Sequence, residues 1–323
     1  MDKQPIAVSV VIPVFNEEES VPVLYSEMKK SLDSLAQEYE IIFVDDGSRD
    51  RTLSLLEGLQ AKDARVVVIS LRRNFGQTAA LSAGFDQARG KVIITLDGDL
   101  QNDPADIPLL LGKSKEYDVV SGWRVNRQDP FLSRRFPSMV ANWIISKVTG
   151  VHLHDYGCTL KAYRREVVQG IRLYGEMHRF IPAIASWMGT SIVEVPTHHR
   201  ARRFGRSKYG ISRIIRVILD LIAVKFLISF STKPIQFFGQ LGSLSILGGI
   251  GISLYLTFIK LFLGKDIGRR PLLLLGALLI ILGVQLVAMG LLGELMVRIY
   301  HEAQAKPIYV VRKILRQADQ PQA

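Results

Sequence analysis

The chain has 323 residues, 48% of them hydrophobic, and its 41 lysines and arginines exceed 30 aspartates and glutamates, for a formal charge of +11. A basic balance predicts an anionic partner: nucleic acid, phospholipid head groups or a phosphorylated substrate. One cysteine, Cys158, excludes an internal disulfide and fits a reducing compartment. The apolar residues 6–15 are interrupted by Pro13 and followed by glutamates, so we expect a buried strand there and not a signal peptide.

Short β-branched and apolar segments alternate with helix-spaced segments along the N-terminal part of the chain. The expected strands are residues 8–12, 41–44, 66–70, 92–96, 119–122 and 192–195. The expected helices are residues 18–36, 52–59, 78–88 and a segment around 139–148, with a polar loop at 124–135 before the last of these. This alternation predicts an α/β fold with a parallel sheet and right-handed connections.

The C-terminal part of the chain has a different character. Residues 211–232 mix apolar and charged side chains, which predicts an amphipathic helix at a membrane interface. Residues 241–259 and 271–293 carry no charge and are long enough to cross a bilayer, and the short linker between them predicts a hairpin. A buried core helix is the alternative reading of such a run, but two adjacent runs favour membrane spans.

These patterns predict a cytosolic domain (1–210), a juxtamembrane helix (211–232), two transmembrane helices (233–300) and a cytosolic tail (301–323). Basic residues flank the hairpin at both ends, which predicts that the catalytic domain and both termini lie on the cytoplasmic side of the inner or plasma membrane. Basic residues in the linker argue in the other direction, but the N-terminal domain has no export signal. Small residues at Gly239/Ser243 and Ser245/Gly249 permit close helix packing, so we expect that a homo-oligomer can form.

Polar clusters follow three of the expected strands, at 13–17, 45–48 and 97–101. In parallel α/β sheets the ligand crevice lies beyond the carboxyl ends of the strands. Asp45, at one of these ends, is suited to accept hydrogen bonds from a ribose hydroxyl or a base N–H; a helix N-cap is the alternative, for which Asp50 is the better candidate.

Two carboxylates in the third cluster form a candidate metal site. Gly98, between Asp97 and Asp99, is expected to let the backbone turn so that both carboxylates approach one cation. Hard oxygen ligands suit Mg²⁺ or Mn²⁺, and such ions usually bind substrate phosphates as well. Gln101 is close enough to add or orient a ligand oxygen. A solvated turn is the alternative reading of an isolated Asp-x-Asp.

Several classes of protein are disfavoured. The chain has neither a G-x-G-x-x-G fingerprint nor a G-x-x-x-x-G-K-[ST] loop, which counts against a dehydrogenase and an NTPase. A nucleic-acid binder is disfavoured because the basic residues cluster beside the apolar segments and not among aromatic platforms.

Five motifs carry a resemblance to a known family: VIPVFNEE (11–18), DDGS (45–48), RNFGQ (73–77), DGDLQ (97–101) and DYGCTLKAYRR (155–165). As a set they resemble the inverting GT-A glycosyltransferases of family 2. More narrowly, the chain resembles the polyprenyl-phosphate branch, which includes dolichol-phosphate mannose synthases, bactoprenol glucosyltransferases and undecaprenyl-phosphate aminoarabinose transferases. The similarity extends through GRSKY (205–209), the two apolar segments and MGLLGE (289–294).

The resemblance implies a fold and a reaction. The fold is a GT-A, Rossmann-like domain with a parallel-type sheet, followed by interfacial helices and a two-helix transmembrane hairpin. The reaction is metal-dependent, inverting transfer of a hexose from a UDP-sugar to undecaprenyl phosphate, in the service of cell-envelope glycosylation. UDP-glucose is the expected donor, while UDP-aminoarabinose, GDP-mannose and UDP-N-acetylglucosamine stay open.

The resemblance also implies roles for individual residues. Donor binding falls to Pro13, Asn16, Glu17, Asp45, Asp46, Gln77, Asp97 and Gly98, and the Mg²⁺ or Mn²⁺ ion to Asp97, Asp99 and Gln101. The acceptor phosphate falls to Arg124, Arg134, Ser138, Arg202 and Lys208. Neighbouring arginines at 135, 203 and 206 leave open which member of each cluster contacts phosphate, and anchoring to anionic lipid is the alternative role for any one of them.

Asp155 matches the family position near the reacting centre, so the expected catalytic set is Asp97, Asp99 and Asp155. It either positions the acceptor or takes a residual proton; a helix cap or a structural partner of an arginine is the alternative. The phosphate nucleophile is already ionised near neutral pH, which lowers the need for a strong base.

Two further functional hypotheses stay open beside this enzyme. A processive polysaccharide synthase would want a Gln-x-x-Arg-Trp motif, and the sequence contains no Arg-Trp pair. A membrane-tethered scaffold would bind a sugar nucleotide without consuming it.

Overall fold

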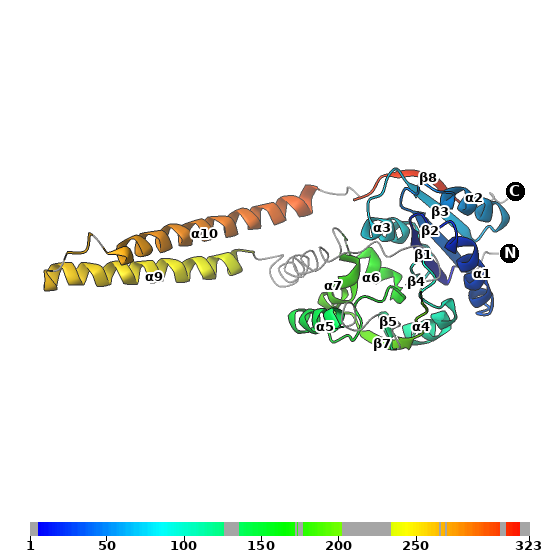
Figure 1. Ribbon diagram of the computed structural model, residues 1–323, viewed down its shortest axis with the longest axis horizontal. Coiled ribbons are helices and arrows are strands. Elements are labelled where there is room, and N and C mark those ends of the chain that lie inside the picture. The colour runs from blue at the N-terminus through cyan, green and yellow to red at the C-terminus, as the bar shows by residue number, and fades with distance from the viewer. Residues whose placement is uncertain are drawn as a thin grey trace. The chain divides into compact units, whose positions relative to one another are not determined.

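A computed structural model describes residues 6–125, 136–171, 173, 177–201, 234–264, 266–268, 270–303 and 308–316 (Figure 1). The chain divides into two compact units: residues up to Val224 together with those from Pro307 onward, and residues Lys225–Lys306. The expected amphipathic helix at 211–232 and the expected phosphate contacts Arg134, Arg202 and Lys208 lie outside the described residues.

The first unit is built on a mixed sheet, whose eight described strands have the order β7-β5-β6-β4-β1-β2-β3-β8. The strands are β1 (Val8–Val14), β2 (Tyr39–Asp45), β3 (Val66–Leu71), β4 (Val92–Thr95), β5 (Val119–Arg124), β6 (Lys161–Arg164), β7 (Ile192–Thr197) and β8 (Val311–Leu315). β1 pairs in parallel with β2 and β4, β2 with β3, and β5 with β7. β6 runs antiparallel to β4 and β5, and β8 runs antiparallel to β3.

The expected parallel α/β sheet is confirmed for six strands, and the two antiparallel strands are additions to it. β6 has only four residues and begins with a lysine, so it lacks the apolar run that marks a buried strand. β8 lies in the segment that was expected to be a tail. It alternates between partly buried and exposed residues at the sheet edge, and two of its five residues, Arg312 and Lys313, are charged. Charged strands of this kind give little sequence signal, because their partners are distant in the chain.

The helices of the first unit form two groups. They are α1 (Ser20–Asp33), α2 (Thr52–Lys62), α3 (Gln77–Gln87), η1 (Pro104–Asp106), α4 (Ile107–Ser114), α5 (Phe136–Thr149), α6 (Arg165–Gln169), η3 (Met177–Phe180) and α7 (Ile181–Trp187). α1 contacts α2 and α4, whereas α3 contacts α6 and η3. Val10 of β1 packs in the core with Met28 of α1, while its neighbour Val11 meets α3, where a Cβ on Gly84 would lie 2.2 Å from the Val11 Cγ1 atom. Helices therefore cover both faces of the sheet, which explains why its central strands are apolar on both sides.

The second unit is a pair of helices, α9 (Pro234–Leu263) and α10 (Pro271–Ala303). Their segments Phe238–Leu263 and Pro271–Gly293 are long and apolar enough to cross a membrane. A Cβ on Gly242 or Gly249 would lie 2.6 Å from the carbonyl oxygen of Gly283 or Gly276, respectively. The close approach of α9 and α10 therefore requires glycine, as in tightly packed membrane helices. Gly249, expected to favour an oligomer, packs inside the hairpin.

Candidate active site

The segment after β4 carries the two carboxylates of the expected metal site. A Cβ on Gly98 would lie 2.8 Å from the Val14 Cγ1 atom and 3.3 Å from the carbonyl oxygen of Pro13. Glycine is thus required here for close packing against the end of β1. The left-handed backbone conformation falls instead on Leu100, which is buried and has a φ of 63°. Gly98 and Asp99 lie in a turn, as expected, and the left-handed residue Leu100 follows directly after it.

Asp97 lies among charged and polar neighbours from several elements. The Gln77 side chain, at the first position of α3, donates a hydrogen bond from Nε2 to Asp97 Oδ1 over 2.7 Å. Burial, together with the nearby charge of Asp99, raises the pKa of Asp97 to about 6, although a hydrogen bond from Thr159 and the charge of Arg124 act in the opposite direction. A cation at this place would relieve the repulsion that the charge of Asp99 exerts on Asp97.

The carboxylates of Asp97 and Asp99 are the candidate protein ligands for a divalent ion. Within the described residues, no group of three or more His, Cys, Asp and Glu side chains has the geometry to hold a metal alone. Asp97 and Asp99 would supply two carboxylates, and phosphate oxygens would complete the shell, as Mg²⁺ and Mn²⁺ sites often do. The Gln101 backbone N–H donates to Asp99 Oδ1 over 3.1 Å and its carbonyl accepts from the Arg200 N–H over 2.8 Å, so Gln101 fixes the loop by its main chain.

The loop after β1 is tied to the loop after β2. Asn16 is exposed and has a φ of 53°, and its backbone N–H donates to Ser48 Oγ over 2.9 Å. Its Oδ1 accepts from the Arg49 N–H over 2.8 Å. The backbone N–H of Glu17 donates to Thr52 Oγ1 over 2.8 Å. Asn16 and Glu17, both expected to bind the donor, thus also join the two strand ends, next to the partly buried Pro13.

Asp45 and Asp46 have different environments at the end of β2. Asp45 is buried, accepts from the Ser48 N–H over 3.1 Å and closes the turn between them. Asp46 is also buried, and its two oxygens accept from the backbone N–H groups of Phe75 and Gly76 over 2.7 and 2.9 Å. Burial raises the pKa of Asp46, and these two donors partly offset that effect. Asp46 therefore anchors the loop that leads to Gln77, a structural task in addition to its expected role at the donor.

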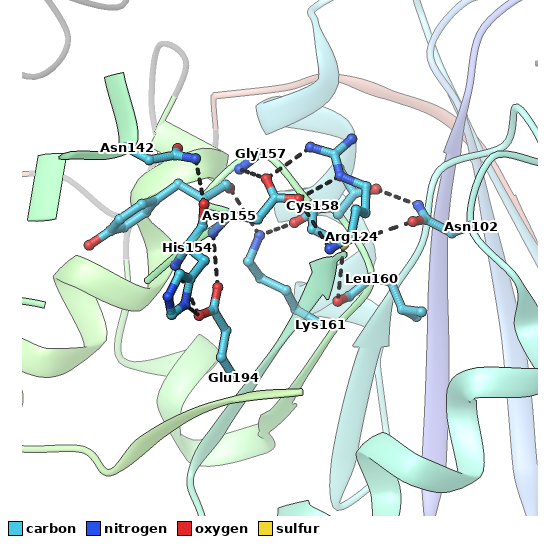
Figure 2. Close-up of polar contacts among 12 residues, drawn as sticks. Asn102, Arg124, Asn142, His154, Asp155, Gly157, Cys158, Leu160, Lys161 and Glu194 are labelled. Atoms are coloured by element: carbon cyan, nitrogen blue, oxygen red, sulfur yellow. Dashed lines mark hydrogen bonds and ion pairs between the residues drawn. The ribbon is translucent and has the colours of Figure 1, made fainter. Parts of the chain in front are cut away.

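Arg124, expected at the acceptor phosphate, and Asp155, expected in catalysis, form a close pair (Figure 2). Arg124 donates from Nε and Nη2 to the two oxygens of Asp155 over 2.6 and 2.9 Å. The Gly157 N–H also donates to Asp155 Oδ1, over 3.1 Å. A carboxylate held by a bidentate arginine is a strong, oriented ion pair and a poor proton acceptor. The structure thus shows Asp155 paired with an arginine, which was the alternative role expected for it.

Three further titratable residues, which sequence reasoning did not select, are buried or partly buried in the same unit. Lys161 of β6 is buried, and its Nζ donates to the carbonyl oxygens of Tyr156 and Cys158. Burial lowers the pKa of Lys161. Glu194 of β7 binds the segment before Asp155, as Figure 2 shows. The third, His178, is buried against Thr78 of α3, and burial holds the pKa of its imidazole well below the usual value.

A sequence signal for two of these residues exists. Lys161 and Glu194 are single charges between apolar residues of a strand, and such a charge needs a buried partner or a function. The positive charges of Arg124 and Lys161 both act to lower the pKa of Asp97. Arg124 was expected to bind the acceptor phosphate and Asp97 the metal ion, so the two expected binding sites are neighbours. Ser138, also expected at the acceptor, is partly buried in α5.

The fold and the site together define an α/β protein with acidic side chains at the carboxyl edge of its sheet. Residues 9–172 match the family described as "Glycosyl transferase family 2". A dodecaprenyl-phosphate galacturonate synthase from Rhizobium johnstonii (strain DSM 114642 / LMG 32736 / 3841) is 46% identical over 326 residues, which cover 99% of this chain and 96% of that protein. The chain belongs to glycosyl transferase family 2, and it is a glycosyltransferase.

Solved structures support the same fold. Glucosyl-3-phosphoglycerate synthase from Mycobacterium tuberculosis, in complex with Mn²⁺ and UDP-glucose, superposes with a TM-score of 0.54 at 19% identity, over 69% of this chain and 79% of that chain. Its complex with Mn²⁺, UDP and glucosyl-3-phosphoglycerate gives a TM-score of 0.53 at 18% identity, over 69% and 80% of the two chains. At this level of identity the likeness concerns the GT-A fold alone.

Proposed function

We propose that this chain transfers a sugar from a nucleotide diphosphate sugar to polyprenyl phosphate. The observation that carries the proposal is the likeness to a dodecaprenyl-phosphate galacturonate synthase, which covers 99% of the chain and so includes the two apolar helices. A lipid-phosphate acceptor needs both a membrane-held enzyme and cationic side chains beside the reacting centre. Arg124, which is partly buried and paired with Asp155, is one such cationic side chain.

The proposed reaction is a displacement at the anomeric carbon. A phosphate oxygen of the acceptor forms the new bond, the bond to the nucleotide diphosphate breaks, and the configuration inverts. The phosphate is ionised near neutral pH, since its second pKa is about 6. Asp155, bound at both oxygens by Arg124, suits the role of positioning the acceptor side better than that of a general base. Arg124 would contribute to acceptor binding, together with Arg134, Ser138, Arg202 and Lys208.

A divalent ion at Asp97 and Asp99 would stabilise the negative charge that develops on the leaving diphosphate. The chain's own residues would hold that site in shape: Gln77 orients Asp97, and the Gln101 main chain orients Asp99. Mn²⁺ accompanies UDP-glucose in the mycobacterial neighbour, which supports Mn²⁺ or Mg²⁺ here. Pro13, Asn16, Glu17, Asp45 and Gly98 would surround the nucleotide end, with Asp46 acting through its loop.

The donor sugar is the least constrained part of the proposal. Sequence resemblance favours UDP-glucose, whereas the name of the Rhizobium relative contains galacturonate. At 46% identity over nearly the whole chain, we place a UDP-linked hexuronate ahead of UDP-glucose. A panel of nucleotide sugars with undecaprenyl phosphate would separate them, since only the accepted donor yields lipid-linked product.

We propose a membrane topology that the connectivity of the chain supports. The residues before the hairpin and the strand β8 after it belong to the same compact unit, and β8 pairs with β3. This connectivity supports a hairpin whose two ends would lie on the same side of the membrane. The basic flanks favour the cytoplasmic side, where nucleotide sugars are available. Labelling of single cysteines placed in the linker 264–270 and in the segment 317–323 tests this topology.

The Asp99→Ala variant tests the enzyme against the scaffold. If the chain is the proposed transferase, this variant folds, retains membrane insertion and loses at least about a hundredfold in turnover. Undiminished turnover by the variant in the presence of Mg²⁺ would overturn the assigned metal role. A wild-type chain that binds a sugar nucleotide but never consumes it would support the scaffold instead.

A further inference from the structure

We propose that Glu194 is a positioning residue of the active site, which holds Asp155 and, through it, sets the orientation of Arg124. This inference rests on the proposed function, because Arg124 is there assigned to the acceptor phosphate. Glu194 does not contact the reacting atoms; its effect passes through the segment from His154 to Asp155.

The carboxylate of Glu194 binds two successive residues at once. Its side chain is 11% exposed in the middle of β7. Oε2 accepts from the His154 backbone N–H over 2.9 Å and lies 2.8 Å from the His154 Nδ1 atom. Oε1 accepts from the Asp155 N–H over 2.9 Å. The Glu194 carboxylate thus contacts the main chain of both residues and the ring of His154.

His154 is also held by neighbours from two other elements. Its ring stacks on Trp123 of β5, with the centroids 4.3 Å apart and the planes at 18°. Its carbonyl oxygen accepts from the Asn142 Nδ2 atom of α5 over 2.6 Å. β5, β7 and α5 thus meet at one residue that precedes Asp155. Such a convergence fixes the backbone immediately before Asp155.

The fixed backbone transmits its position to the guanidinium group. Asp155 receives Arg124 Nε and Nη2 on its two oxygens, so the plane of the guanidinium follows the plane of the carboxylate. Gly157 leaves room for this pair, since a Cβ there would lie 3.1 Å from Arg124 Nη2. A displacement of the Asp155 main chain therefore moves Arg124. Geometry of this kind is what a supporting shell contributes to a functional site.

Glu194→Gln is the direct test. The glutamine side chain keeps the shape but offers one acceptor oxygen in place of two, so it cannot bind both backbone N–H groups. We expect the KM for undecaprenyl phosphate to rise about tenfold, as for the loss of a charged hydrogen bond, while the KM for the nucleotide sugar changes less than about twofold. A purely structural role would lower thermal stability and the amount of active enzyme without separating the two KM values.

Asp118→Asn is the matched control. Asp118 also joins the β5–β7 pair by a carboxylate, since its Oδ2 accepts from the Ser191 N–H and Oγ over 2.8 Å each, but it lies at the opposite end of the strands. We expect this variant to lose comparable thermal stability and to keep both KM values. An unchanged acceptor KM in Glu194→Gln, or an equal rise in Asp118→Asn, would overturn the proposal.

A second variant, Asn142→Ala, tests the proposal in case Glu194→Gln does not fold. Asn142→Ala removes only the contact from α5 to the His154 carbonyl, at a partly exposed position. We expect a rise of about threefold in the acceptor KM alone, in keeping with the loss of one neutral hydrogen bond. An unchanged acceptor KM would then overturn the proposal. Failure of the wild-type chain to transfer sugar at all would contradict the proposed function instead, which is a different result.

Discussion

Gln77 and Asp97 are joined by a hydrogen bond of 2.7 Å between the side-chain amide of the first residue of α3 and the first carboxylate after β4. Gln77 was expected to contact the donor, and in the structure its side chain binds and orients the carboxylate of Asp97. Residues that orient a metal ligand typically contribute about tenfold to a hundredfold in metal affinity.

The Gln77→Leu variant tests that relationship. We expect its affinity for Mn²⁺ to fall by about tenfold, because Asp97 loses the donor that fixes its rotamer. Gln87→Leu, at the other end of α3, is the control and should bind Mn²⁺ as the wild type does. Titration of bound Mn²⁺ by electron paramagnetic resonance measures both. Equal affinities in all three proteins would show that the hydrogen bond does not support the metal site.

The raised pKa of Asp97 predicts a pH-dependent stability for the metal-free protein. A folded-state pKa of about 6 exceeds the value of an unfolded aspartate, so the folded chain binds a proton that the unfolded chain has released. Below about pH 4 Asp97 is protonated in both states and does not lower the free energy of unfolding. This free energy falls as the pH rises from about 4 to about 6. Asp97→Asn has no such proton to lose.

The thermal midpoints of the wild type and Asp97→Asn should thus converge near pH 4 and separate above pH 6, with the variant more stable. Scans in buffers containing a chelator measure this difference. A gap that stays constant from pH 4 to 7 would contradict the burial of an ionised Asp97.

The Arg124–Asp155 pair predicts strong energetic coupling. Arg124→Met, Asp155→Asn and the double variant form a cycle in which each single change removes the bidentate contact. We expect a coupling energy above about 1 kcal/mol, since the two residues are in direct, partly buried contact. Thermal unfolding in detergent provides the free energies. Additive effects would mean that the two side chains act independently.

β8 predicts a sharp boundary for C-terminal truncation. The strand covers the edge of β3, the Tyr309 hydroxyl donates to Asp86 over 2.7 Å, and Arg316 donates to the Gln87 carbonyl over 2.8 Å. Removal of residues 308–323 exposes the unpaired edge of β3, which invites aggregation. Removal of residues 317–323 leaves the strand complete and serves as the control.

Size-exclusion chromatography in detergent distinguishes the two truncations. We expect the shorter deletion to elute with the wild type, and the longer one to aggregate with a lower thermal midpoint. If both deletions behave like the wild type, β8 contributes nothing to the sheet in solution.

The sequence predicted those features whose signal is local. The apolar runs of β1 to β5 and β7 mark buried strands, and the carboxylates of Asp97 and Asp99 follow β4 directly, so their place at the sheet edge could be inferred. β8 could not, because its strand depends on β3, far away in the chain. For the same reason the sequence could not predict that Asp46 anchors another loop, since its hydrogen-bond donors, Phe75 and Gly76, are distant in the chain.

The site shows the same limit. Asp155 and Arg124 were each assigned to the reaction, but nothing in the sequence pairs them, since they are separated by 31 positions. A single charge in a short strand marks Glu194 and Lys161 as candidates, but the sequence does not identify their partners. Long-range contacts, and not residue type, decide these roles.

Transfer to a lipid phosphate is the central claim, and one comparison of acceptors tests it most directly. The purified full-length chain is incubated with Mn²⁺, UDP-galacturonate or UDP-glucose, and either undecaprenyl phosphate or undecaprenol, and the lipid fraction is analysed by mass spectrometry. We expect a polyprenyl-phosphate sugar with one of the donors, and no product from undecaprenol, because the ionised phosphate is the nucleophile. Equal transfer to undecaprenol, or only free sugar and UDP with both lipids and both donors, would contradict the account.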